Sequence, residues 1–335
     1  MRQFEGYLKG VNLGGWISQF DVYSEEHFNS FIQEADIKRI SEMGFDHVRV
    51  PVDYNVLETE TGEVIESGYG HIEDCLAWCK KYGLKMIIDV HEVYGYSFDP
   101  LKDMDREKFF YDEALQARFY RLWETIATRF GKESDTVAFE LLNEVVLKKV
   151  YKAWNDVAKK AVEHIRAIAP DTYIVIGGVN YNNVTSVALL DAPYDDKIVY
   201  NFHCYDPIIF THQKAYWVEN MTPDFELAYP VSLEELREKS KAFPKECTTA
   251  IYNERLTSVG PQFFEELFSE ALEVAEKYNV PLYCGEYGVI ELAPKEDTKR
   301  WLADIHSVFD KYGIGRAVWN YKGKDFGIID SDYGF

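Results

Sequence analysis

Two glutamates could act together on one chemical bond. Glu144 and Glu286 each follow a short apolar stretch, residues 136–142 and 281–284, that reads as a buried strand. A carboxyl group on each of two strands is the minimum apparatus for cleaving a glycosidic bond, because one protonates the leaving oxygen while the other attacks the anomeric carbon. The first segment alone is equally well explained as a strand-end turn. Its recurrence near the end of the chain favours the catalytic interpretation.

Further polar side chains stand at the ends of the other predicted strands. The parallel strands of a barrel would deliver all of them to one pocket, whereas an open sheet would spread them along an edge. The competing doubly wound sheet also lacks support, because Gly10 to Gly15 does not have the spacing of a dinucleotide-binding loop. A (β/α)8 TIM barrel is therefore predicted. The strand-end residues are Asn12, Arg49, His91, Asn143, Glu144, His203, Glu286 and Trp319.

Strand-like and helix-like segments alternate along the chain and give eight strand candidates. One early helix is predicted over residues 28–43. We expect a single catalytic domain over residues 1–335, with a lid or subdomain inserted at about 206–260, where the alternation breaks after the sixth strand. Phe335 follows the last predicted strand, 317–320, too closely for an eighth helix. If nothing else covers the seam between the first and last strands, low stability is expected.

The composition excludes several classes of partner. A net charge of −21 argues against nucleic acid, an anionic membrane or an acidic polysaccharide, while a neutral polymer is compatible. Aromatic residues make up 16% of the chain, enough for both core packing and platforms for sugar rings. No apolar stretch reaches membrane-spanning length, and residues 1–6 carry no apolar signal segment. A cytoplasmic protein and a secreted one whose leader has been removed both remain possible.

The cysteines predict neither a disulfide framework nor a metal site. Cys75 and Cys79 share a helix face, but no histidine or further cysteine completes a ligand set around them. Free, mostly buried thiols are expected for these two and for Cys204, Cys247 and Cys284. No cofactor motif is found, so neither a metal nor a cofactor is expected.

The strand-end residues resemble the site of glycoside hydrolase family 5, whose retaining (β/α)8 enzymes carry acid/base and nucleophile on strands four and seven. The resemblance runs from Gly10 to about Asp330, and the segments 10–20, 139–146 and 211–215 look most like the clostridial endoglucanase C type. All eight site positions of the family are filled in order by the expected residue types. They are Arg49, His91, Asn143, Glu144, His203, Tyr205, Glu286 and Trp319.

The resemblance implies a role for each of these side chains. Glu144 would be the acid/base, its pKa raised by partial burial and by the charge of the nucleophile Glu286. Arg49 and Tyr205 would keep Glu286 ionised, and His203 would tune the proton of Glu144. The substrate would be held by Asn143 at the sugar 2-hydroxyl, by His91 at a neighbouring hydroxyl and by Trp319 beneath the ring.

Each assignment has a structural alternative. Arg49 could form a barrel ion pair, His91 and His203 could be core histidines, and Trp319 could simply pack. Asp89 and Glu140 are expected to point away from the site or into the barrel wall. One departure from the family concerns Glu92, which stands where relatives often carry a second histidine.

The implied activity is that of a retaining endo-β-glucanase acting as a monomer on β-1,4-glucan, or on mixed-linkage glucan or glucomannan. A β-mannanase and an exo-acting β-glucosidase are the alternatives within the family. A non-catalytic carbohydrate-binding barrel is the alternative from another class, and the presence of both glutamates disfavours it. Retention predicts that the two carboxyl groups lie roughly 5 to 5.5 Å apart.

Overall fold

The computed structural model describes residues 1–323, 325–329 and 331–334, without the side chains of residues 246, 247 and 249. Eight parallel strands close into a barrel in chain order, which confirms the predicted fold class. The pairs Gly10–Ala317 and Val11–Val318 join the last strand to the first. The strands are β1 (Gly10–Asn12), β2 (His47–Asp53), β3 (Lys85–Glu92), β4 (Val137–Glu140), β5 (Ile174–Gly177), β6 (Ile198–Cys204), β7 (Leu282–Tyr287) and β8 (Gly315–Val318).

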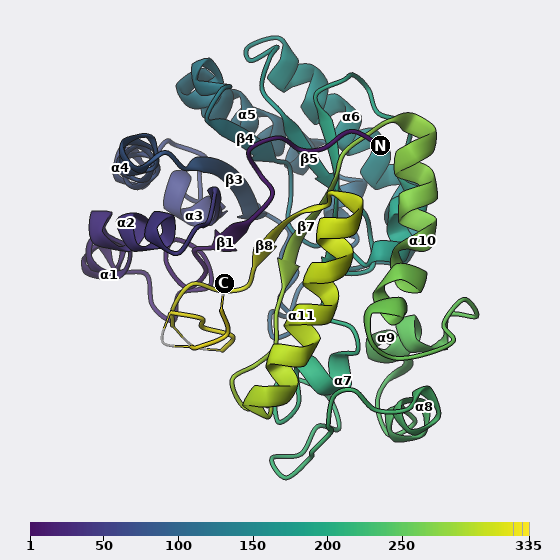
Figure 1. Cartoon of the computed structure of the whole chain (residues 1–335). Helices are drawn as coiled ribbons and strands as arrows, with labels where there is room; N and C mark the ends of the chain where they lie inside the picture. Colours follow the sequence, from purple (N-terminus) through teal and green to yellow (C-terminus); the bar gives the residue numbers. More distant parts are fainter. Residues whose placement is uncertain (324, 330, 335) are drawn as a thin grey trace.

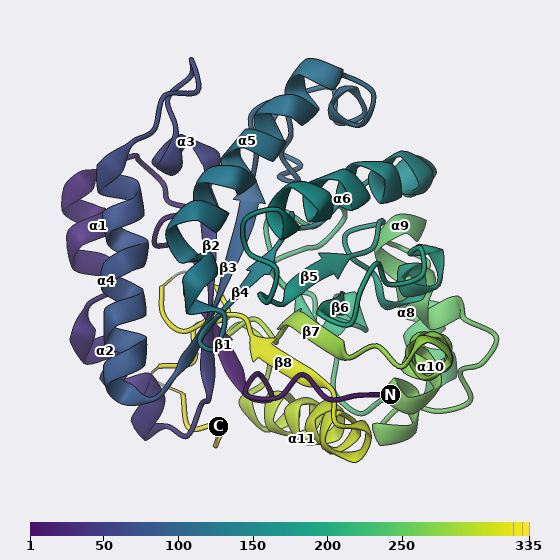
Figure 2. The same cartoon turned by 90° about the horizontal axis from the view of Figure 1, so that it is seen from above.

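Helices form an outer layer around the strands (Figures 1 and 2). Their apolar faces pack on the outward-facing strand residues, as expected where crossover helices cover a parallel sheet. They are α1 (Glu25–Phe31), α2 (Glu34–Glu42), α3 (Tyr54–Leu57), α4 (Glu66–Tyr82), α5 (Glu113–Phe130), α6 (Tyr151–Arg166), α7 (Ile208–Thr211), α8 (Leu233–Ser240), α9 (Lys245–Thr248), α10 (Pro261–Tyr278) and α11 (Lys295–Tyr312), with 3-10 turns at Lys108–Phe110, Gly131–Glu133, Lys148–Val150, Val184–Leu189 and Thr249–Tyr252.

The single helix predicted over residues 28–43 is wrong, because the chain breaks between α1 and α2. Ile32 and Gln33 adopt extended backbone angles. Gln33 then begins α2 with a capping box, in which its backbone N–H donates to Asp36 Oδ2 at 2.9 Å. The apolar stripe continues across the break, with Phe28 and Ile32 both buried, so periodicity alone could not show it.

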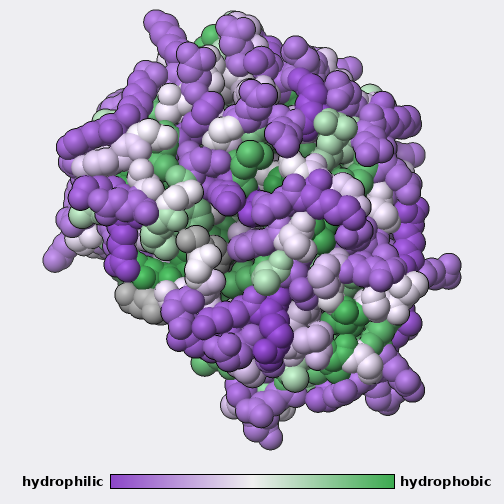
Figure 3. Space-filling view, in the orientation of Figure 1, coloured by the Kyte–Doolittle hydropathy of each residue, from purple (hydrophilic) through white to green (hydrophobic). Residues whose placement is uncertain are grey.

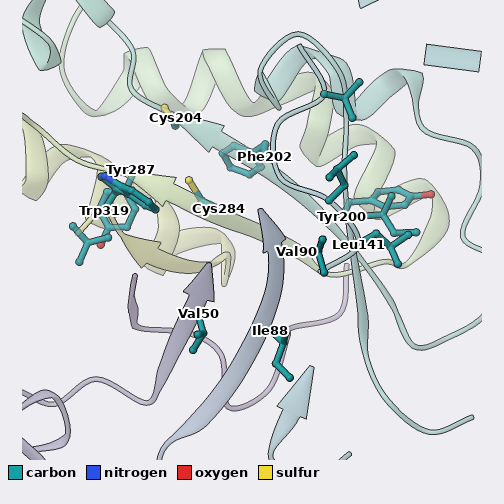
Figure 4. Close-up of a cluster of buried hydrophobic side chains, with 14 of the residues drawn as sticks. Val50, Ile88, Val90, Leu141, Tyr200, Phe202, Cys204, Cys284, Tyr287 and Trp319 are labelled. Carbon is teal, nitrogen blue, oxygen red and sulfur yellow. The ribbon is translucent and has the colours of Figure 1, made fainter. Parts of the chain in front are cut away.

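Outward-facing strand residues belong to the main hydrophobic core between barrel and helices. Figure 4 shows part of this core, including Val50, Ile88, Val90, Phe202 and Cys204. A second, smaller cluster fills the barrel interior at the N-terminal ends of the strands. There the stacked rings of Phe4 and Tyr7, 4.1 Å apart, close the bottom of the barrel. The functional residues therefore stand above a packed floor.

The segment after β8 covers the seam between β8 and β1. No helix follows β8 among residues 319–323, 325–329 and 331–334. Tyr321, Phe326 and Ile328 are instead buried, and the Tyr321 backbone N–H donates to Asn12 O at 2.9 Å. Arg39 of α2 donates to Ile329 O at 2.7 Å. The open seam on which low stability was predicted is therefore not found in the described part of the chain.

The long connection between β6 and α10 contains α7, α8 and α9, which lie together at the lower right of Figure 1. Its role as a lid stays a prediction. The face of the molecule seen in Figure 3 is covered mainly by hydrophilic residues. None of the helices built from described residues is both long and apolar enough to cross a bilayer.

The four cysteines whose side chains are described, Cys75, Cys79, Cys204 and Cys284, are free and buried, as predicted. Cys247 was included in the same prediction, but its side chain lies outside the described residues.

Candidate active site

The two glutamates predicted to act together face each other across a short gap. One carboxylate oxygen of Glu144, one of Glu286 and a ring nitrogen of His203 all lie within 4.8 Å of one another. Retaining glycosidases hold their carboxyl groups roughly 5 to 5.5 Å apart, whereas inverting enzymes need about 6.5 to 9.5 Å to admit a water molecule. The spacing fits direct attack by one of the glutamates.

Glu286 is held inside β7 by a cation and a phenol. Arg49 Nη1 donates to Glu286 Oε1 at 2.8 Å, and Tyr205 Oη donates to Oε2 at 3.0 Å. Burial raises the pKa of Glu286, while the positive charge of Arg49 opposes that rise. Both contacts stabilise the ionised carboxylate, which is the form that a nucleophile requires.

Glu144 lies in an environment that favours its protonated form. Burial and the negative charge of Glu286 raise the pKa of Glu144 well above its ordinary value. His203 Nδ1 lies 2.8 Å from Glu144 Oε1. Burial lowers the pKa of His203 far below its ordinary value, so this imidazole is neutral at pH 7 and leaves the proton on the carboxyl group. Glu144 is thus suited to be the acid of the pair.

Arg49 is fully buried and connects several residues of the site through hydrogen bonds. Besides Glu286, its guanidinium donates to Asn12 Oδ1 at 2.9 Å and to Asn143 Oδ1 at 3.0 Å. Its fork binds Glu140 through Nε to Oε2 at 2.7 Å and Nη2 to Oε1 at 2.9 Å. These contacts hold the guanidinium in the orientation in which it reaches Glu286.

Leaving Asp89 and Glu140 out of the site was wrong. Asp89 Oδ2 lies 3.0 Å from Arg49 Nη2 and 2.5 Å from His91 Nδ1. Residues two apart on a strand share a face, so alternation already placed Asp89 on the same side as His91. Glu140 also accepts from Asn201 Nδ2 at 2.8 Å, and nothing in the sequence singled out Asn201.

His91, Asn143 and Trp319 are the residues predicted to bind the sugar. The rings of His91 and Trp319 stack in parallel, with centroids 5.8 Å apart. Burial lowers the pKa of His91 to about 4, so the ring is neutral. Asn143 Nδ2 is buried and has no hydrogen-bond partner within the described part of the chain. With Asn143 Oδ1 occupied by Arg49, this amide is left to donate, as the predicted contact with a sugar hydroxyl requires.

The structure thus brings all eight predicted site residues, from Arg49 to Trp319, to the C-terminal end of the barrel. Among the described residues, Glu144, His203 and Glu286 also lie close enough together to act as ligands of a metal ion. The guanidinium of Arg49 already neutralises Glu286 on that side.

The comparisons with known proteins show the family of this chain. A model of the cellulase family, glycosyl hydrolase family 5, matches residues 8–325. The chain belongs to this family. Cellodextrinase A of Ruminococcus flavefaciens is 43% identical over 316 residues, which cover 94% of this chain and 86% of the relative. Endoglucanase C of Acetivibrio thermocellus is 42% identical over 329 residues, which cover 97% and 94%.

Solved structures share the fold of this family 5 chain at lower identity. Endoglucanase Cel5A from Thermotoga maritima matches with a TM-score of 0.74 and 22% identity, covering 97% of this chain and 93% of that one. The cellulose synthase subunit Z from Clostridioides difficile matches with a TM-score of 0.75 and 20% identity, covering 96% and 94%. At these identities the likeness concerns the barrel.

Glu92 is the last residue of β3 and directly follows the site residue His91. Its carboxylate is turned toward the loop after β3, where Oε1 accepts from Ser97 Oγ at 2.5 Å and Oε2 pairs with Lys102. Asp53 lies opposite Glu92 in the β2–β3 register. Burial and the charge of Glu92 raise the pKa of Asp53 to about 8. Glu92 therefore anchors a loop beside the site.

Proposed function

We propose that this family 5 protein hydrolyses β-1,4-glucosidic bonds inside neutral glucan chains, with retention of the anomeric configuration. The observation that carries the proposal is the separation of the Glu144 and Glu286 oxygens, within 4.8 Å, with a cation holding one carboxylate and a neutral imidazole beside the other. Relatives named endoglucanase C and cellodextrinase A support β-1,4-glucan as the substrate class. Mixed-linkage glucan and glucomannan contain the same bond and are further candidate substrates.

The reaction proceeds in two displacements. Glu286 attacks the anomeric carbon while Glu144 gives its proton to the departing oxygen, which leaves a glycosyl ester on Glu286. The charge of Glu286 is lost in that step, so one of the two causes of the high pKa of Glu144 is removed, its pKa falls, and Glu144 can then act as a base. It removes a proton from water, which attacks the same carbon and releases Glu286 as a carboxylate.

The remaining side chains bind the sugar. Asn143 Nδ2 has no hydrogen-bond partner among the described residues, and on this proposal it donates to the sugar 2-hydroxyl, a contact that strengthens in the transition state. Trp319, stacked on His91, supplies an apolar surface for the sugar ring. All eight side chains come from one chain, so the enzyme acts as a monomer on this proposal, which light scattering at assay concentration tests. The acidic charge of −21 suits a neutral substrate.

The test compares the wild type with Glu286→Gln on a cellulose derivative, lichenan, glucomannan, mannan and xylan. We expect hydrolysis of the glucans by the wild type and loss of it in the variant, whose folding is checked by circular dichroism. Glu63→Gln, at an exposed position, is the matched control and should keep full activity.

The stereochemistry gives a second readout. Proton NMR of early product should show the β-anomer first. Unchanged turnover by Glu286→Gln, or an α-anomer formed first, would contradict the mechanism. A preference for mannan over the glucans would favour the β-mannanase alternative.

A further inference from the structure

Glu144 lies outside the hydrogen-bonded ladder of strands that contains Arg49, His91, His203 and Glu286. β4 ends at Glu140, so the chain has left the strand when it reaches Glu144. Glu286, in contrast, lies within β7 and pairs in register with His203 of β6. A proton donor must be placed accurately to act, because a displacement of about 1 Å can cost about a hundredfold in rate. The backbone of Glu144 therefore needs another support.

The hydroxyl group of Tyr96 provides that support on both sides of the residue. Tyr96 Oη donates to Glu144 O at 2.7 Å and accepts from Val146 N at 2.9 Å. A phenol has one proton to donate and lone pairs to accept, so one side chain can replace both missing backbone partners. Val145, between Glu144 and Val146, is held by a different residue, because Tyr181 N donates to Val145 O at 3.2 Å.

Tyr96 is itself fixed by a tight turn and by aromatic packing. The turn Val93–Tyr96 is closed by backbone hydrogen bonds in both directions, 2.9 and 3.2 Å, and contains Gly95 at φ 87°, a conformation that favours glycine. The ring is 1% exposed and packs against Phe109 and Phe110, with centroids 5.8 and 5.4 Å away. These contacts hold the Tyr96 hydroxyl beside the backbone of Glu144.

We infer that Tyr96 is a positioning residue for the acid/base group: its hydroxyl sets the backbone of Glu144, and thereby the carboxyl group, at the distance from which the leaving oxygen can be protonated. The inference rests on the proposed role of Glu144. It makes no claim that Tyr96 touches the substrate. Removing the hydroxyl should weaken acid catalysis selectively and leave attack by Glu286 intact.

The test uses Tyr96→Phe, which keeps the buried ring, and two substrates that differ only in their leaving group. The phenol of phenyl β-cellobioside needs a proton to leave, whereas the dinitrophenolate of 2,4-dinitrophenyl β-cellobioside leaves as a stable anion. We expect kcat/KM to fall by about tenfold or more on the phenyl substrate and by less than about threefold on the dinitrophenyl substrate, because acid assistance contributes only where the leaving group is poor. The test quantity is the ratio of kcat/KM on the dinitrophenyl substrate to kcat/KM on the phenyl substrate. Measuring both values on one preparation cancels any inactive fraction.

Tyr7→Phe is the matched control. Tyr7 is buried as well, and its hydroxyl donates to Thr136 O at 3.2 Å, just before the opposite end of the same strand, β4. This variant should lose stability with the ratio unchanged. Glu144→Gln is the positive control and should raise the ratio more than Tyr96→Phe does.

The outcomes separate this inference from the proposed function. A ratio within about twofold of wild type in Tyr96→Phe, while Glu144→Gln raises it, overturns the positioning role alone, since general acid catalysis contributes factors well above that. An unchanged ratio in Glu144→Gln overturns the acid assignment and the inference with it. An equal fall on both substrates in Tyr96→Phe assigns it a structural role only.

Discussion

Replacing Arg49 by lysine should separate the structural role of its fork from its role in holding Glu286 ionised. Arginine offers five N–H donors in a rigid plane, whereas lysine offers three on one flexible nitrogen. In the structure the guanidinium serves oxygens of Asn12, Glu140, Asn143 and Glu286. With three donors in place of five, the shorter ammonium group would lose at least two of these five hydrogen bonds.

The size of the effect on stability follows from that count. A hydrogen bond to a charged group is worth about 1.5 to 3 kcal/mol, so two losses lower the free energy of unfolding by about 3 to 6 kcal/mol. With an unfolding entropy of about 2.1 cal/mol/K per residue, the 335 residues give about 0.7 kcal/mol/K. The midpoint of thermal unfolding should therefore fall by about 4 to 9 °C in differential scanning calorimetry.

The pH profile carries the functional part of the prediction. Arg49 opposes the rise that burial causes in the pKa of Glu286, so weakening that contact raises the pKa further. Glu286 must be ionised to attack. The acid limb of kcat/KM against pH should therefore move to higher pH in Arg49→Lys.

Arg118→Lys is the control for this experiment. Arg118 is also buried, but it donates to Glu58 Oε1, Thr59 O and Glu60 O at 2.6 to 2.7 Å. Its variant should lose stability and keep the acid limb in place. If Arg49→Lys lowers the unfolding midpoint but leaves the acid limb where it is in the wild type, Arg49 does not control the ionisation of Glu286.

Two further variants test the surroundings of the site. In Gly14→Ala the new Cβ would lie 2.7 Å from the Trp319 ring, so the ring must tilt and kcat/KM should fall. Gly70→Ala in α4 is the control, because a Cβ there meets nothing within 4 Å, and it should raise the free energy of unfolding by about 0.5 to 1 kcal/mol. Equal activity of the two variants would refute the prediction for Gly14→Ala. Asp53 has a pKa of about 8 in the folded state, raised by burial and by the charge of Glu92. The wild type therefore loses stability as pH rises from about 4 to about 8, because the buried carboxyl group must lose its proton. Asp53→Asn avoids this loss, so its stability relative to the wild type should grow over the same range. Urea unfolding at pH 5 and pH 8 measures this gain, and equal differences at the two values would contradict it.

The sequence was sufficient for the fold class, and it named the eight residues on which the proposed mechanism relies. Each strand is a short apolar run, and its last residues must face the mouth of a closed barrel, so the order of Arg49, Glu144 and Glu286 along the chain already placed them together. The capping box at Gln33 was also present as a local signal. It was hidden by an apolar stripe that runs on through the break.

The tertiary structure decided which groups surround those residues. Strand alternation placed Asp89 on the same side as His91, but only the closed barrel shows that Asp89, Glu140 and Asn201 form the network around and beneath Arg49, because these contacts join strands through the barrel interior. The support of Glu144 by Tyr96 depends on a loop whose path no periodic pattern encodes. Hydrophobic periodicity reports which face of an element is buried, whereas hydrogen bonds across a barrel depend on where distant segments meet.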